Sequence, residues 1–163
     1  MKYLKQMKIH GFKKFKDFSI IFNKDTNIIV GDNESGKSTI LEAIDVVLSQ
    51  GYKNYDKYII KELLNSDLVA KFKSSSNIED LPYILIDLEF QLDDIPYSAL
   101  FYGANHSLEK NQDKFGIRFM CKIPDDIIAD LMPIIELGQI PYDYYQMSWN
   151  TFQGDSYSSI KKP

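Results

Sequence analysis

The chain has 163 residues, a net charge of −4, and a composition that is 44% hydrophobic and 13% aromatic. This length and apolar content allow one folded domain with a proper core, so we expect residues 1–163 to form a single domain and not a disordered chain. The single cysteine, Cys121, excludes an intrachain disulfide and a cysteine-based zinc site, and the acidic balance argues against a domain that wraps nucleic acid.

The N-terminal residues predict two strands joined by a turn. Residues 1–9 and 17–22 have strand patterns, the second with Phe18, Ile20 and Phe22 on one face, and the turn covers residues 10–16. Lysines at positions 2, 5 and 8 interrupt every apolar run here, so nothing resembles a signal peptide, and no segment of the chain reaches transmembrane length. We therefore expect a cytoplasmic protein with no membrane partner.

The same region is strongly basic. Residues 1–24 carry seven lysines and one acid, Asp17, which is a local excess of +6. Exposed lysines are ordinary on strands near a sheet edge, so we interpret them as a solvated strand face. A patch that contacts a phosphate backbone is the alternative interpretation.

A phosphate-binding loop follows a third predicted strand, at residues 26–30. Residues 31–38 match the pattern G-x-x-x-x-G-K-[ST]. Gly31 and Gly36 give the backbone freedom that lets successive N–H groups turn toward a phosphate chain. Lys37 then reaches the β- and γ-phosphates, the Ser38 hydroxyl binds Mg²⁺, and Thr39 touches the α-phosphate, next to the positive end of the following helix.

The loop therefore predicts a site for ATP and Mg²⁺, with Ser38 as the metal ligand. A glycine-rich turn before a Ser-capped helix is the plainer interpretation, but it leaves Lys37 without a role. We expect the following residues to bind the nucleotide: Gly31, Asp32, Asn33, Glu34, Ser35, Gly36, Lys37, Ser38 and Thr39.

One apolar stripe predicts a helix over residues 36–50, and Gly51 then ends it. Glu42 lies off this stripe, with Asp45 and Ser49, and we interpret all three as solvated. The stripe consists of Ile40, Leu41, Ile44, Val47 and Leu48.

The remaining residues alternate between helices and strands. A second helix is predicted over 54–66, a flexible polar connection over 71–80, and a long loop over 93–114. Pro124 begins a helix that Pro133 kinks or ends. Alternating strands are predicted over 83–92, 115–123 and 142–152, and alternation with one polar face is typical of an antiparallel sheet. The chain therefore predicts an α/β fold with an added antiparallel β subsheet.

Asp87 follows three apolar residues and so has the form of a Walker B aspartate. The segment alternates, however, and Glu89 and Gln91 continue its polar side. We therefore interpret Asp87 as a surface carboxylate on an antiparallel strand rather than as a metal ligand.

Three features together resemble the N-terminal region of the ABC-type ATPase heads of SMC and RecF-like proteins, and within that group the OLD-family ATP-dependent endonucleases. They are the phrase GFKKF at residues 11–15, the G-x-N start of the loop at Gly31 and Asn33, and the stretch NIIVGDNESGKSTILEAIDVVL between a strand ending in IIF and an antiparallel pair. The aromatic segment YDYYQMSWNTFQGDSY is also similar to a part of OLD-type ATPase domains.

The resemblance implies a P-loop NTPase fold with an ABC-ATPase-type lobe, in which Lys13 approaches the base or ribose side of the nucleotide. Such heads hydrolyse ATP as dimers: water attacks the γ-phosphate while Lys37, the catalytic residue, and Mg²⁺ at Ser38 neutralise charge. The sequence contains no signature motif of the LSGGQ kind and no strand ending in Asp-Glu. We therefore expect the N-terminal lobe of a longer ATPase, which binds ATP by itself with little or no turnover.

In the intact protein, the resemblance implies a homodimer whose ATP cycle controls DNA binding or a nuclease, in DNA repair or phage defence. Two alternatives stay open. A self-contained P-loop kinase or GTPase needs a lid arginine or an NKxD motif, and the chain has neither; Arg118 is its one arginine. A nucleotide-gated interaction module, whose partner supplies DNA binding or catalysis, is the second.

Overall fold

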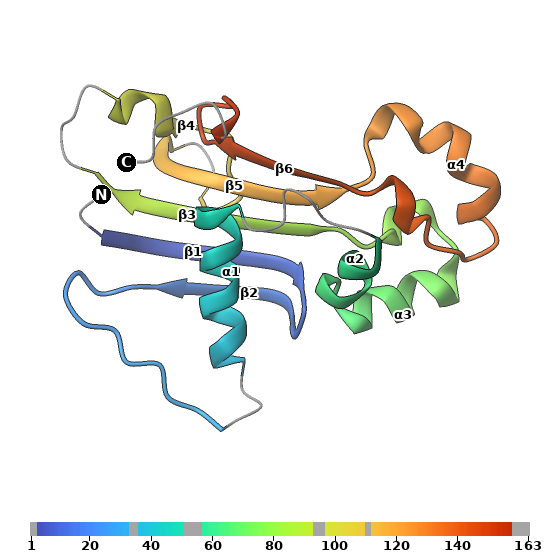
Figure 1. The fold of residues 1–163 in the computed structure, drawn as a ribbon, viewed down its shortest axis with the longest axis horizontal. Coiled ribbons are helices and arrows are strands. Elements are labelled where there is room, and N and C mark those ends of the chain that lie inside the picture. The colour runs from blue at the N-terminus through green and yellow to red at the C-terminus, as the bar shows by residue number, and fades with distance from the viewer. Residues whose placement is uncertain (1–2, 33–35, 51–56, 93–96, 110–111, 158–163) are drawn as a thin grey trace.

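The computed structural model describes residues 3–32, 36–50, 57–92, 97–109 and 112–157. Its centre is an antiparallel sheet with the strand order β2-β1-β3-β5-β4, in which β6 also pairs with β5 (Figure 1). The six strands are β1 (Tyr3–Phe12), β2 (Phe15–Ile21), β3 (Ile84–Gln91), β4 (Tyr102–Gly103), β5 (Lys114–Lys122) and β6 (Gln146–Thr151). The predicted antiparallel strands are thus confirmed, although the first turn contains only Lys13 and Lys14 and not all of residues 10–16.

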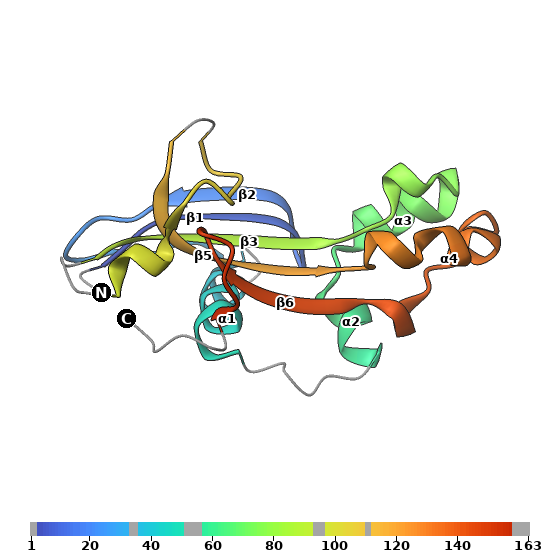
Figure 2. The same ribbon diagram turned by 90° about the horizontal axis from the view of Figure 1, so that it is seen from above.

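Helix α1 (Lys37–Ser49) crosses one face of this sheet, while residues 104–109 lie over the other face (Figure 2). Alternate strand residues point toward α1 because side chains of a strand project to opposite faces. Met7, Ile86 and Phe119 therefore join Val46 and Val47 of α1 in one buried cluster. Trp149 of β6 fixes the helix further by donating a hydrogen bond from Nε1 to the Val46 carbonyl at 2.8 Å.

The predicted helix after the loop is confirmed, with one difference in its buried stripe. Gly36 at its start and Gln50 at its end both adopt the left-handed conformation, while Gly51 lies outside the described residues. Ile40 and Val47 are buried as expected, but Leu41 is 64% exposed. Ala43 and Val46 face the sheet in its place.

The region between α1 and β3 is more helical than its composition indicates. Helix α2 (Lys57–Leu63) lies within the predicted helix, and α3 (Ser66–Ser75) covers part of the residues predicted as a flexible connection. Asn65 caps α3 by accepting hydrogen bonds from two backbone N–H groups, and Leu68 and Phe72 bury one face of the helix. The 3₁₀ helix η1 (Ile78–Asp80) then leads into β3.

The C-terminal half follows its predicted order. The segment predicted as a loop over 93–114 contains the 3₁₀ helix η2 (Ser98–Phe101) and the short strand β4. After β5 come the 3₁₀ helix η3 (Asp125–Ile127) and α4 (Ile128–Ile135), which contains Pro133. The 3₁₀ helix η4 (Tyr142–Tyr144) precedes β6.

The third predicted strand is not formed. Residues 26–30 run as irregular chain, and the side chains of Ile28 and Val30 are 81% and 83% exposed. A strand needs hydrogen-bonded neighbours, and no other strand among the described residues pairs with this segment. The prediction of a strand here was therefore wrong for the described part of the chain.

The polar face predicted for β3 is present, but the prediction that solvent covers it was wrong at Asp87 and Glu89. Asp87 is 0% exposed, and Glu89 beside it is buried as well. Both carboxylates lie on the sheet face opposite α1, where basic residues of β1 and β5 pair with them beneath residues 105–107. On β3, the polar positions 87 and 89 therefore form buried ion pairs instead of facing solvent.

Candidate functional site

The phosphate-binding loop leads into α1 through Gly36, whose φ of 92° is left-handed. An added Cβ at this position would lie 2.7 Å from the Phe15 ring at the start of β2. Gly36 is therefore required both by its backbone conformation and by the close approach of β2. Its hydrogen bond from Ile40 N at 3.0 Å begins the helix.

The residues on either side of Gly36 present the groups that a phosphate chain needs. The Lys37 ammonium turns back toward the loop and donates a hydrogen bond to the Gly31 carbonyl. Ser38 is exposed and Thr39 is buried, both in the first turn of α1, which contains no acidic residue. The positive end of the helix is thus not offset by a carboxylate within its first turn. Gly31 and Asp32 are exposed, while the predicted binding residues Asn33, Glu34 and Ser35 lie outside the described residues.

A basic cavity of about 460 Å³ lies beside Thr39. It lies between the β1–β2 turn and the junction of α2 and α3. Its lining has three lysines and one acid: Lys13, Lys14, Thr39, Lys61, Glu62, Leu64 and Ser66. The structure therefore brings Lys13, which the sequence connects with the loop only by resemblance, to the same cavity as Thr39.

Glu42, which we interpret as solvated, is partly exposed and has an ion-pair partner at this site. Its Oε1 lies 2.5 Å from the Lys13 ammonium, and both side chains are about one third exposed. Glu42 follows Thr39 by three residues, which places the two on one face of α1. Sequence reasoning missed this contact because the pair joins residues 29 positions apart.

Asp87 lies away from this site. The strand residues on either side of it, Ile86 and Leu88, belong to the cluster that contains α1, so Asp87 projects from the opposite face. Arg118 donates two hydrogen bonds to its carboxylate, from Nε at 2.8 Å and from Nη2 at 2.9 Å. Ser107 donates two more, from N and Oγ, each at 2.7 Å. Asp87 is thus an ion-pair residue of the sheet, neither a surface carboxylate nor a neighbour of Ser38.

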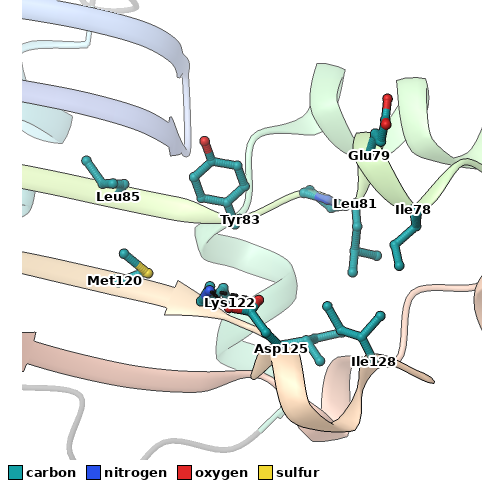
Figure 3. A pocket seen from close by; sticks show the side chains of 11 residues that line it. Ile78, Glu79, Leu81, Tyr83, Leu85, Met120, Lys122, Asp125 and Ile128 are labelled. Atoms are coloured by element: carbon teal, nitrogen blue, oxygen red, sulfur yellow. Dashed lines mark hydrogen bonds and ion pairs between the residues drawn. The ribbon is translucent and has the colours of Figure 1, made fainter. Parts of the chain in front are cut away.

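A second cavity, of about 390 Å³, lies at the end of β3 and β5 that is near α4 (Figure 3). Its walls are mainly apolar, with Leu85, Met120 and Ile128 among them, and the one ion pair drawn there joins Lys122 to Asp125. No residue of α1 lines it. This cavity is therefore separate from the phosphate-binding loop.

Two further kinds of site find no support among the described residues. No group of three or more His, Cys, Asp or Glu side chains is placed to hold a metal ion by itself. Cys121 is completely buried, and this burial raises the pKa of its thiol to about 12, which favours the protonated form over the thiolate. In the same described ranges, no helix combines the length and the apolar character needed to cross a bilayer.

Comparison with known families gives a match over most of the chain. A family model described as an AAA domain matches residues 6–152. The chain is also similar to proteins with names from chromosome maintenance and DNA repair. It is 43% identical over 65 residues to the chromosome segregation protein sudA of Emericella nidulans, which covers 39% of this chain and 5% of that protein.

Two bacterial relatives match similarly short segments. The chromosome partition protein Smc of Fusobacterium nucleatum is 54% identical over 54 residues, covering 32% of this chain and 5% of that protein. The DNA replication and repair protein RecF of Clostridium kluyveri is 45% identical over 42 residues, covering 26% and 12%. The matches thus span only a small part of each relative.

A solved structure from work on "ATP-driven dimerization and DNA stimulated activation of SMC ATPases" is also similar. It has 21% sequence identity and a TM-score of 0.44, and the match covers 85% of this chain and 80% of that one.

Proposed function

The chain belongs to the AAA domain family, and on this premise we propose that it binds ATP and Mg²⁺ as the N-terminal lobe of a longer SMC/RecF-like ATPase. The observation that carries this proposal is the start of α1. A left-handed Gly36, an ammonium directed at the loop and a helix N-terminus free of acids come together at one point. Such a combination binds a phosphate chain.

The order of groups along α1 suggests how ATP lies. Lys37 and Ser38 are at the β- and γ-phosphate end, and Thr39 is at the α-phosphate end. The nucleoside then extends past Thr39 into the cavity lined by Lys13 and Lys61. A volume of about 460 Å³ is within the range of small-molecule sites.

Ser38 is the residue that would hold Mg²⁺. Its side chain is exposed in the first turn of α1, so its hydroxyl is accessible to an ion beside the phosphates. Mg²⁺ keeps several waters and uses phosphate oxygens, so one protein hydroxyl suits it. When bound, the ion supplies positive charge against the phosphate oxygens, and the ammonium of Lys37 adds a second positive charge there.

Exposed apolar residues near the loop support the proposal that other strands complete this lobe. Ile28 and Val30 lie on the irregular chain before the loop, and Leu41 lies on the side of α1 away from the sheet cluster. An added strand beside residues 26–30 would pair their backbone and cover these side chains. The short spans of the matched relatives agree with a chain that is one part of a larger ATPase. Without the remaining part, we expect little or no turnover.

The narrower parts of the proposal rest mainly on the resemblance. They are membership of the OLD family, a cytoplasmic homodimer formed through the ATPase heads, and an ATP cycle that controls DNA binding or a nuclease in repair or phage defence. The names of the RecF and Smc relatives support the connection with DNA. A nucleotide-gated interaction module remains the second candidate, because the exposed apolar residues would also suit a separate partner chain.

Calorimetric titration of the purified chain with Mg-ATP tests the proposal. Lys37→Ala removes a charged donor to phosphate. Loss of such a hydrogen bond costs about 1.5–3 kcal/mol, so the affinity should fall roughly 10- to 140-fold. Lys73→Ala, at an exposed lysine of α3, is the matched control and should bind like the wild type. An unchanged affinity in Lys37→Ala would refute the site. Tighter binding of GTP than ATP, or phosphoryl transfer to a small acceptor, would favour the GTPase or kinase instead.

A further inference from the structure

Asn65 joins the β1–β2 hairpin to the start of α3, beside the cavity next to Thr39. It is 2% exposed and lies between α2 and α3. Its backbone N donates a hydrogen bond to the Gly11 carbonyl at 2.9 Å, and its Nδ2 donates to the Lys13 carbonyl at 2.7 Å. Its Oδ1 accepts from the backbone N–H groups of Asp67 and Leu68 in the first turn of α3, at 3.2 Å each. One buried side chain thus connects the β1–β2 turn with the helix that follows the cavity.

The turn needs this connection because Lys13 has an unfavourable backbone conformation. Its φ of 47° is left-handed, which few residues with a Cβ adopt without support from their surroundings. Two hydrogen bonds hold it there: Lys13 N donates to the Leu63 carbonyl at 2.7 Å, and Asn65 binds the Lys13 carbonyl. Without the Asn65 amide, the peptide after Lys13 loses the partner that fixes its direction.

The conformation of the turn decides where the Lys13 side chain goes. With its carbonyl held by Asn65, Lys13 extends across the first turns of α1, where its ammonium reaches Glu42 at 2.5 Å. This places the ammonium on the same face of α1 as Thr39 and at the edge of the basic cavity.

We propose that Asn65 is a positioning residue of the nucleotide site, which acts by holding Lys13 against the nucleoside side of bound ATP. This inference rests on the proposed function, because it requires that the cavity beside Thr39 receives the nucleoside. Asn65 itself contacts no part of the nucleotide. Glu42 assists by fixing the direction of the Lys13 ammonium.

A double-mutant cycle on the whole chain tests this role. Asn65→Ser keeps a side-chain oxygen that can cap α3 but removes the amide that binds the Lys13 carbonyl. Lys13→Ala removes the ammonium. We expect each single variant to weaken ATP binding about tenfold, and the double variant to bind no more weakly than either single one. Asn77→Ser, the same change at the exposed cap of η1, is the control and should bind like the wild type.

Binding of inorganic tripolyphosphate, compared with binding of ATP, distinguishes the proposed role of Asn65 from a purely structural one. Lys37→Ala should weaken binding of both ATP and tripolyphosphate, because both contain the phosphate chain. Asn65→Ser and Lys13→Ala should weaken ATP alone. Equal losses for both compounds, additive losses in the cycle, or unchanged ATP affinity in Asn65→Ser would each overturn the proposal.

A replacement variant covers the case in which Asn65→Ser does not fold. If Asn65→Ser unfolds at the assay temperature, Glu42→Gln replaces it in the cycle with Lys13→Ala. Glu42 is about one third exposed, and this change removes only the anchor of the ammonium. Coupling in that cycle supports the positioning network, and its absence overturns it. If the wild-type chain does not bind ATP, the proposed function is refuted. If Lys37→Ala weakens ATP binding but the cycle shows no coupling, only the role of Asn65 is refuted.

Discussion

Replacing Arg118 by methionine would isolate the fully buried carboxylate of Asp87. Methionine fills a volume close to that of the arginine stem, so the change removes mainly the charge and its hydrogen bonds. Breaking a buried ion pair by removal of one partner costs about 3–5 kcal/mol. Ser107 continues to donate two hydrogen bonds to Asp87, so we expect a loss near the lower end, about 3 kcal/mol.

Urea unfolding followed by circular dichroism measures this loss as a shift in the midpoint at constant slope. Lys122→Met is the matched control on the same strand, because Lys122 pairs with Asp125 at the surface. An exposed pair contributes about 0–1 kcal/mol, so this variant should stay close to the wild type. The double variant Asp87→Asn/Arg118→Met should recover part of the stability, because a neutral amide still accepts from Ser107.

A loss of less than about 1 kcal/mol in Arg118→Met, the value expected for an exposed pair, would contradict the burial of this ion pair. So would a double variant Asp87→Asn/Arg118→Met that is less stable than Arg118→Met, because the penalty would then not come from an unpaired charge. Either result would mean that Asp87 reaches water, in contrast to its complete burial in the structure.

Two further predictions concern the loop and the sheet. Gly36→Ala should lower the free energy of unfolding by about 1–3 kcal/mol and weaken ATP binding. The change places a Cβ on a residue with left-handed backbone conformation, directly against the Phe15 ring. A melting temperature equal to that of the wild type would contradict this prediction. Burial lowers the pKa of Lys114, but its ion pairs with Glu89 and Glu109 outweigh burial and raise the pKa above its usual 10.5. Because the folded-state pKa is the higher one, the contribution of this lysine is complete below pH 10.5 and is lost as the pH rises through the folded-state pKa. The melting temperature of the wild type should therefore fall more between pH 9 and 12 than that of Lys114→Met, and equal falls would contradict the pairing.

Local patterns in the sequence were sufficient for β1, β2, β3, β5 and β6, for α1 and for the left-handed glycine before it. A strand has a two-residue period and a helix a period of 3.6, so both leave a readable pattern in the order of apolar residues. The glycine-rich loop is likewise a short continuous motif, and its glycine at position 36 has the left-handed conformation that the motif requires. The roles of the loop residues in binding ATP remain predictions.

Only the tertiary structure decided which residues surround the candidate site and which polar residues are buried. Asn65 and Glu42 reach Lys13 from 52 and 29 positions away, and Asp87 meets Arg118 across two paired strands 31 positions apart. Residues 26–30 show the reverse case, because their apolar pattern predicts a strand but no described strand pairs with them. The physical reason is the same throughout: periodicity specifies the conformation of a segment, whereas pairing, burial and charge neutralisation depend on partners that only the folded chain brings into contact.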